Sequence, residues 1–152
     1  GYESAIDTAR ELIASYNTVI LLPEDAAVES NGNRIDCDFS EMSGNPFLDI
    51  GPRTAAKYIE IITNSAVVFA NGPMGYFEKE VFASGTKMVL QAIADCKGVT
   101  VVGGGHMGAM ANKMQLDSKI THISTGGGAT INFLTGKKLD LILALEDAAK
   151  RM

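Results

Sequence analysis

The sequence has few of the features that mark several large protein classes. It contains only two cysteines, Cys37 and Cys96, which lie far apart and without CxxC spacing. This scarcity argues against a disulfide framework or a zinc site and favours a reducing compartment. No apolar run approaches the roughly 20 residues that a membrane span requires, and no signal peptide is visible. We therefore expect a cytoplasmic protein with no membrane partner.

Basic charge and two common nucleotide motifs are also missing. The net charge of −5 and the isoelectric point near 5.0 argue against nucleic acid as a partner. A Walker A motif is absent, because neither of the two triple glycines is followed by Lys-Ser or Lys-Thr. No GxGxxG with a following acidic partner stands near the start, which disfavours a nicotinamide cofactor.

The hydrophobic pattern alternates between strands and helices. With 152 residues, 46% of them hydrophobic, the chain is expected to form one domain over 1–152. Helices are predicted at 5–16, 53–63, 80–95, 108–114, 128–134 and 139–151, and strands at 18–22, 26–29, 34–36, 65–70, 99–102 and 120–123. An Asn-Gly pair at 31–32 indicates a hairpin between the second and third strands. The expected fold is α/β, a Rossmann-like parallel sheet with helices on both faces and a small β-hairpin insertion.

Three glycine-bearing segments, at 71–75, 103–105 and 126–128, each follow a predicted strand. Glycine lets the backbone approach a ligand closely, and a helix that begins there presents free N–H groups and the positive end of its dipole. The two triple glycines therefore predict two phosphate-binding corners that face one cleft. The segment at 71–75 is read either as a simple turn or, because it also follows a strand, as a third ligand contact.

Several polar side chains beside these corners allow two interpretations each. Glu78 or Glu80 begins the next helix as a favourable first-turn charge, or one of them binds a ribose. Ser124 and Thr125 cap the following helix, a role compatible with phosphate binding. His106 either donates to a phosphate or is an exposed bystander.

Taken together, these segments resemble phosphoglycerate kinase. The matching motifs are Leu-Asp-Ile-Gly-Pro at 48–52, Asn-Gly-Pro-Met-Gly-Tyr-Phe-Glu at 71–78, Phe-x-x-Gly-Thr at 82–86, Gly-Gly-Gly-His at 103–106 and His-Ile-Ser-Thr-Gly-Gly-Gly-Ala at 122–129. The resemblance extends from about residue 7 to residue 145, and the order and spacing of the motifs make it specific.

The resemblance implies a part of a larger, two-domain enzyme. The chain looks like the later part of the C-terminal nucleotide-binding domain, without the N-terminal domain that binds 3-phosphoglycerate and without a Gly-Gly-Ala-Lys segment. The implied activity of the parent enzyme is phosphoryl transfer between 1,3-bisphosphoglycerate and ADP, giving 3-phosphoglycerate and ATP in glycolysis. The rival interpretation is a noncatalytic module that binds nucleotide weakly or not at all and is inactive alone.

The family pattern also implies roles for individual residues. Backbone N–H groups of Gly105 and Gly128 would stabilise the transferring phosphoryl group, which makes them the expected catalytic positions. Glu78 would bind the ribose hydroxyls, and His122 matches a hinge-region histidine. The residues implied to bind nucleotide are Asn71, Pro73, Glu78, Gly103, Gly104, Gly105, His106, Met107, Ser124, Thr125, Gly126 and Gly127.

One position departs from the common pattern. Most relatives carry an aspartate after the first triple glycine, which holds the magnesium of the nucleotide, whereas this chain has His106-Met107, as in archaeal-type members. Imidazole is a poor magnesium ligand compared with a carboxylate. We therefore expect Mg²⁺ to arrive with ATP or ADP, no protein-bound metal site in this chain, and His106 to contact phosphate.

Overall fold

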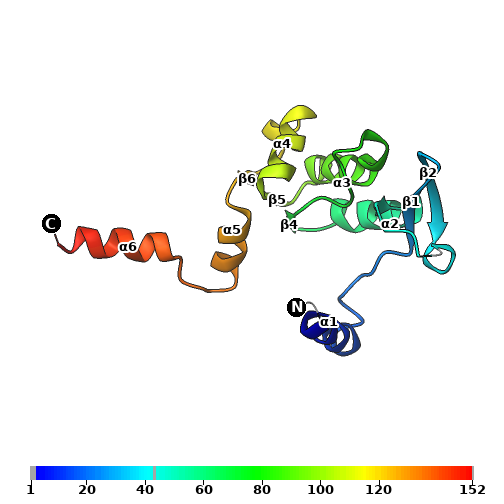
Figure 1. Ribbon diagram of the computed structural model, residues 1–152. Helices are drawn as coiled ribbons and strands as arrows, with labels where there is room; N and C mark the ends of the chain where they lie inside the picture. Colours follow the sequence, from blue (N-terminus) through cyan, green and yellow to red (C-terminus); the bar gives the residue numbers. More distant parts are fainter. Residues whose placement is uncertain (1–2, 43, 152) are drawn as a thin grey trace.

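The computed structural model describes residues 3–42 and 44–151 and contains two three-stranded sheets (Figure 1). The helices are α1 (Glu3–Ser15), α2 (Pro52–Thr63), α3 (Ser84–Asp95), α4 (Gly105–Lys113), α5 (Gly127–Leu134) and α6 (Asp140–Ala149), with short 3₁₀ turns η1 (Phe39–Glu41), η2 (Glu80–Phe82) and η3 (Asp117–Lys119). Among the described residues, no helix has the length and apolar character needed to cross a bilayer.

The smaller sheet is antiparallel and contains the predicted hairpin. Its strands β1 (Asp25–Ser30), β2 (Asn33–Asp38) and β3 (Asp49–Ile50) lie in the order β2-β1-β3. Asn31 and Gly32 form the two-residue turn, and both have positive φ, 51° and 79°. Since a two-residue hairpin turn requires that conformation, the Asn-Gly pair fixes the register of β1 against β2.

The second sheet is parallel and sets the position of the glycine segments. Strands β4 (Val67–Asn71), β5 (Val99–Gly103) and β6 (His122–Ser124) lie in sequence order. Asn71 is paired with Gly103, and Gly103 with Ser124, so the three strands end level with one another. This confirms the predicted parallel α/β arrangement.

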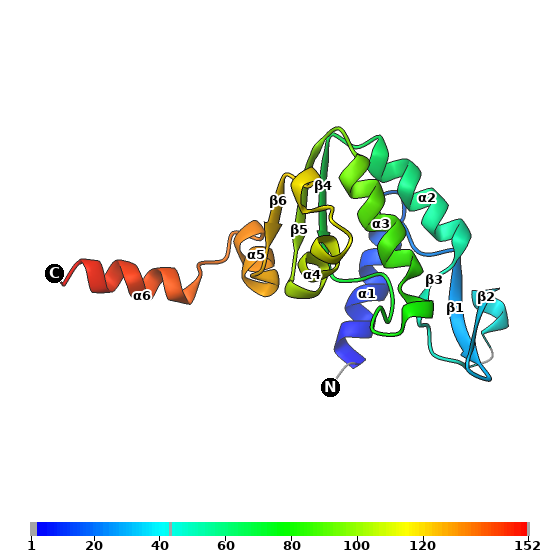
Figure 2. The ribbon, with the colours of Figure 1, turned by 90° about the horizontal axis from the view of Figure 1, so that it is seen from above.

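The hydrophobic core lies on one face of the parallel sheet. Alternate residues of β5 point to this face, where Val102 is fully buried against Leu90 and Ile93 of α3 and Met107 of α4. Met107 and Met110 thus pack in the core at helical spacing, as an apolar stripe on α4 predicts. Figure 2 shows α2 and α3 lying alongside each other, on the β4 side of the parallel sheet.

On the opposite face of the sheet, Val67 and Phe69 are 68% and 41% exposed, and α5 lies across a cavity from the strands. This cavity of about 500 Å³ is lined by Phe69, Val101 and His122 from the strands and by Phe133 from α5, among others. Helices do lie on both faces, but unequally. Neither α1 nor α6 contains a buried residue, and α6 projects away from the sheets in both views (Figures 1 and 2).

Two local predictions are wrong. The predicted strand at 18–22 is a turn followed by extended chain, in which Val19 is 71% exposed. Among the described residues no strand pairs with its β-branched residues to complete a hydrogen-bonded ladder, so strand propensity alone does not make a strand. The helix predicted at 80–95 begins instead at Ser84, after η2, where the N–H of Gly85 is bound by a carboxylate from β3.

Candidate functional site

The three glycine-bearing segments meet at the carboxyl edge of the parallel sheet. The N–H of Gly104 donates to the carbonyl of Ser124 at 2.9 Å, which joins the first triple glycine to the end of β6, just before the second. A Cβ placed on Gly127 would lie 3.0 Å from the Cα of Gly104 and 3.4 Å from Asn71 Oδ1. The clustering that the sequence predicted is therefore confirmed, with the Asn71 side chain between the corners.

The glycines at this edge serve two different needs. Gly104 has a φ of +96°, a conformation that L side chains rarely adopt, and a Cβ on Gly127 would be in tight contact with the backbone of Gly104. Gly105 and Gly128, by contrast, lack a positive φ, and a Cβ on either would meet nothing within 4 Å. Since the fold does not require glycine at Gly105 or Gly128, the space beside them is available for a ligand.

Helices α4 and α5 begin at this edge without a side-chain cap. Their N-cap residues are Gly104 and Gly126, neither of which provides a side-chain capping bond. The first N–H groups of an α-helix have no partner within the helix. The N–H groups and positive dipole ends of these two uncapped helix starts therefore lie close together, an arrangement suited to an anion.

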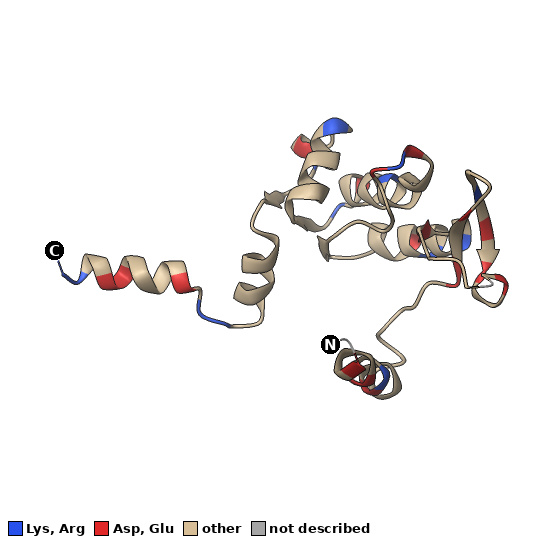
Figure 3. Cartoon of the chain, in the orientation of Figure 1, with Lys and Arg blue, Asp and Glu red and all other residues tan. Residues whose placement is uncertain are grey.

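No formal charge lies in the two segments that form these corners. Residues 98–112 and 120–136 contain no Lys, Arg, Asp or Glu, and the ribbon from β6 through α5 is uniformly tan in Figure 3. Attraction of an anion at this edge would come from backbone dipoles rather than side-chain cations. Neither segment contains a carboxylate that would repel a phosphate.

His106 and Met107, which follow the first triple glycine, lie in different surroundings. The His106 side chain is exposed, and its ring lies 5.4 Å from the ring of Phe77, centroid to centroid, at 52°. Phe77 comes from the loop that follows β4, so this contact joins that loop to the start of α4. Met107 is fully buried in the core. Only its backbone can take part in the site.

Other predicted site residues lie along the rim. Asn71, Pro73 and Glu78 are exposed, so their polar groups are open to solvent. Ser124 does not cap α5: its hydroxyl accepts the N–H of Gly126 at 3.3 Å and lies 2.7 Å from the hydroxyl of Thr130.

The prediction that Ser124 and Thr125 cap α5 is therefore wrong, because Gly126 occupies the N-cap position. The first-turn role holds for Glu80 alone, which begins η2 and pairs with Lys87, whereas Glu78 lies in the preceding turn.

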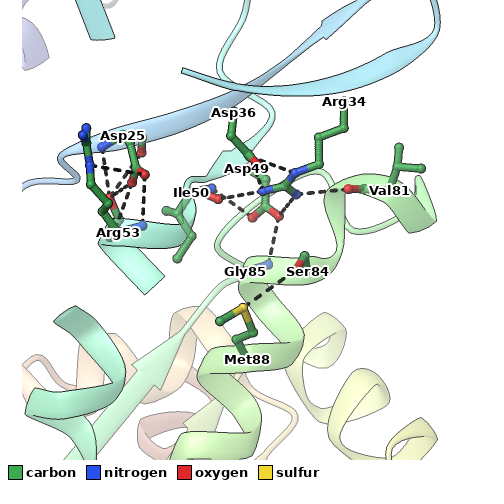
Figure 4. Close-up of polar contacts among 11 residues, drawn as sticks. Asp25, Arg34, Asp36, Asp49, Ile50, Arg53, Val81, Ser84, Gly85 and Met88 are labelled. Carbon is green, nitrogen blue, oxygen red and sulfur yellow. Dashed lines mark hydrogen bonds and ion pairs between the residues drawn. The ribbon is translucent and has the colours of Figure 1, made fainter. Parts of the chain in front are cut away.

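The starts of α2 and α3 are closed by buried carboxylates from the antiparallel sheet, a feature that the sequence analysis missed (Figure 4). Asp25 of β1 is 4% exposed and accepts the N–H groups of Arg53 and Thr54 at 3.0 and 2.9 Å, in the first turn of α2. Burial raises the pKa of the Asp25 carboxyl, but hydrogen bonds from Thr54 and Arg53 outweigh it, and the net pKa lies below its ordinary value.

Asp49 of β3 does the same for α3 and is fully buried. Its Oδ2 accepts the N–H of Gly85 at 2.9 Å and forms an ion pair with Arg34 Nη1 at 2.7 Å, while its Oδ1 accepts the N–H of Ile50 (Figure 4). The sequence gives no signal for these caps, because Gly51 and Ala83 before α2 and α3 lack a capping side chain just as Gly104 and Gly126 before α4 and α5 do.

The side chains near this edge show whether the chain could hold a metal ion there. Within the described residues, no group of three or more His, Cys, Asp or Glu side chains is placed to hold a metal ion. Asp25 and Asp49 use their oxygens on N–H groups and arginines, and the imidazole of His106 is a nitrogen donor that suits magnesium poorly.

The fold and this edge define an α/β protein whose ligand-facing loops follow parallel strands. Comparison with known proteins makes the assignment specific, since residues 2–137 match the phosphoglycerate kinase family model. Phosphoglycerate kinase of Methanothermus fervidus is 44% identical over 150 residues, which cover 99% of this chain and 37% of the relative. That of Methanococcus maripaludis is 42% identical over 153 residues, with the same shares covered.

Solved structures agree. The crystal structure of phosphoglycerate kinase from Pyrococcus horikoshii OT3 superposes with a TM-score of 0.86 at 39% identity, over 98% of this chain and 38% of that one. The enzyme from Coxiella burnetii gives 0.79 at 32% identity, over 90% and 37%. The chain belongs to the phosphoglycerate kinase family, and it spans a little over a third of the length of these relatives.

Proposed function

We propose that this chain forms the later part of the C-terminal nucleotide-binding domain of a phosphoglycerate kinase and binds the phosphates of ADP or ATP at the starts of α4 and α5. The observation that carries the proposal is the meeting of two uncapped helix starts at one sheet edge. In the parent enzyme the reaction is phosphoryl transfer between 1,3-bisphosphoglycerate and ADP. Catalysis of phosphoryl transfer depends chiefly on positioning the reactants and on hydrogen-bond donors directed at the charge that develops in the transition state.

Each predicted residue then has a role set by its chemistry. The N–H groups of Gly105 and Gly128 stabilise the transferring phosphoryl group, because nothing of the chain fills the space beside them. Gly104, Met107 and Gly127 contribute backbone to the phosphate cradle, which Gly103, Gly126, Ser124 and Thr125 shape. Glu78 binds ribose hydroxyls, and Asn71 and Pro73 line the nucleotide.

Magnesium arrives with the nucleotide and is held by its phosphate oxygens, while the imidazole of His106 donates to phosphate. 3-Phosphoglycerate binds through the N-terminal domain, whose residues are not among the 152 here. The two unpaired cysteines agree with a cytoplasmic location.

A titration of the ¹⁵N-labelled chain with ADP tests the proposal. We expect the largest amide shifts at residues 104–107 and 126–129, and smaller ones at 71–78. A coupled assay on the same chain should show no turnover, because it lacks the 3-phosphoglycerate site and the Gly-Gly-Ala-Lys lysine. Absence of ADP binding, or shifts centred elsewhere, would overturn the site, and turnover near that of intact relatives would overturn the assignment as a partial domain.

A further inference from the structure

The Phe-x-x-Gly-Thr motif at 82–86 takes no part in the proposed function, yet its Phe, Gly and Thr residues are buried. Phe82 and Thr86 are each 1% exposed, and Gly85 is buried. A Cβ on Gly85 would lie 2.4 Å from Asp49 Oδ1, so the carboxylate occupies the space of a side chain. The motif therefore forms a packed junction between α3 and β3.

Thr86 extends this junction to the loop that follows β4. Its hydroxyl oxygen accepts the backbone N–H of Met74 at 3.1 Å, in the middle of the loop at 71–78. Because Thr86 is in the first turn of α3, this bond ties the loop to a rigid element 12 residues further along the chain.

Asp49 and its neighbour Leu48 hold the same loop from the other side. The N–H of Tyr76 donates to the carbonyl of Leu48 at 2.7 Å. Gly75 lies against the carboxylate, because a Cβ there would be 2.5 Å from Asp49 Oδ1. Arg34 fixes that carboxylate through its ion pair. The loop is thus held at three consecutive residues, 74, 75 and 76.

We propose that Thr86 and Asp49 are positioning residues that fix the loop carrying Asn71, Pro73 and Glu78 in its binding conformation. They do not touch the nucleotide, and the inference rests on the proposed function of this loop. An exposed loop with two glycines loses much conformational entropy when a ligand orders it. Holding the loop in place beforehand removes part of that cost and raises affinity.

The experiment compares two buried threonines that make the same kind of bond. Thr86→Val removes the acceptor for the Met74 N–H. Thr100→Val is the matched control, because Thr100 is also 1% exposed and accepts a backbone N–H, that of Thr121, at 3.1 Å, near the amino end of β5 and away from the site. Urea unfolding, ADP affinity and hydrogen exchange of the Met74 amide are measured for both variants and for Thr86→Ser.

We expect both valine variants to lose similar stability, while Thr86→Val alone weakens ADP binding by about five- to tenfold, the scale of one hydrogen bond. Exchange of the Met74 amide should accelerate in Thr86→Val only, and Thr86→Ser, which keeps the hydroxyl, should restore both properties. If Thr86→Val folds poorly, Thr86→Ala against Thr86→Ser gives the same contrast.

Equal ADP affinity in Thr86→Val and Thr100→Val would overturn the proposal, as would Met74 exchange that is unchanged in Thr86→Val. Failure of the parent chain to bind ADP would instead overturn the proposed function. The Met74 amide would still decide whether Thr86 restrains the loop, so the two failures are distinguishable.

Discussion

Helices α2 and α3 begin in one way, and helices α4 and α5 in another. Asp25 and Asp49, reaching over from the antiparallel sheet, fill the first turns of α2 and α3 with buried carboxylates. Helices α4 and α5 begin instead at glycines that provide no side-chain cap, and the segments around them carry no charge. The same chain thus closes two helix starts and leaves two open.

The two kinds of helix start have different roles: the closed starts stabilise the fold, and the open starts are available to bind a ligand. A buried carboxylate satisfies N–H groups and complements the helix dipole, so the closed starts hold the antiparallel sheet against α2 and α3. A carboxylate at the start of α4 or α5 would occupy the donors and repel a phosphate. Open, glycine-lined starts are stable because solvent reaches their N–H groups, and they remain available to an anion.

The largest expected effect is at Asp49, in the closed region. Asp49→Asn leaves the Arg34 guanidinium, 19% exposed, without its buried partner. We expect the free energy of unfolding to fall by about 3 kcal/mol, the lower end of the range for breaking a buried ion pair. Urea denaturation measures it, with Asp36→Asn as control, because Asp36 pairs with the same arginine but is 43% exposed. If both variants lose the same free energy of unfolding, Asp49 contributes no more to stability than the exposed Asp36.

Asp25 is expected to have the next largest effect, with a distinct pH signature. Asp25→Asn should cost about 2 kcal/mol at neutral pH, the scale of a lost helix cap. Because the folded-state pKa of Asp25 lies below the ordinary 3.8, its stabilisation is fully present above that value and is lost as pH falls through the folded pKa.

The parent should therefore lose stability more steeply on acidification below 3.8 than Asp25→Asn. Thr54→Val, which removes a hydrogen bond that lowers this pKa, should give an intermediate slope. Parallel acid-unfolding curves for parent and Asp25→Asn would contradict this account.

The open starts predict the opposite pattern for glycine substitutions. Gly105→Ala and Gly128→Ala should fold as well as the parent, because a Cβ meets nothing there. ADP binding should weaken about tenfold, or about 1.4 kcal/mol. Gly85→Ala at the closed start of α3 is the contrast: its Cβ would collide with Asp49, and overpacking of this kind costs about 2 kcal/mol. Thermal unfolding and ADP titration distinguish substitutions at open starts from those at closed starts. A destabilised Gly105→Ala would contradict the distinction between open and closed helix starts.

The smallest expected effect is at His106. His106→Ala should weaken nucleotide binding by about 1 kcal/mol, the value of one hydrogen bond. His106→Asp should make binding depend more strongly on Mg²⁺, because a carboxylate is a better magnesium ligand. Titrations with and without Mg²⁺ on the parent and both variants measure this. Unchanged affinity of His106→Ala under both conditions would make His106 a bystander.

The sequence by itself was sufficient for features that depend on short stretches of chain. The Asn-Gly pair at 31–32 predicted the hairpin, because few other residues adopt positive φ at both turn positions. Apolar, β-branched runs after 65 and 98 predicted two parallel strands, and the glycines that follow predicted corners at one edge. Family motifs then predicted the assignment that the comparisons establish.

Only the tertiary structure decided which distant residues complete these elements. The segment at 18–22 has strand propensity but no strand beside it, and so stays extended and exposed. Asp25 and Asp49 have no assigned role in the sequence analysis, yet the fold brings each to a helix start 28 and 36 residues away. Whether a residue caps a distant helix, or holds a loop as Thr86 does, depends on where a second segment of the chain packs. The sequence near that residue does not specify where the second segment lies.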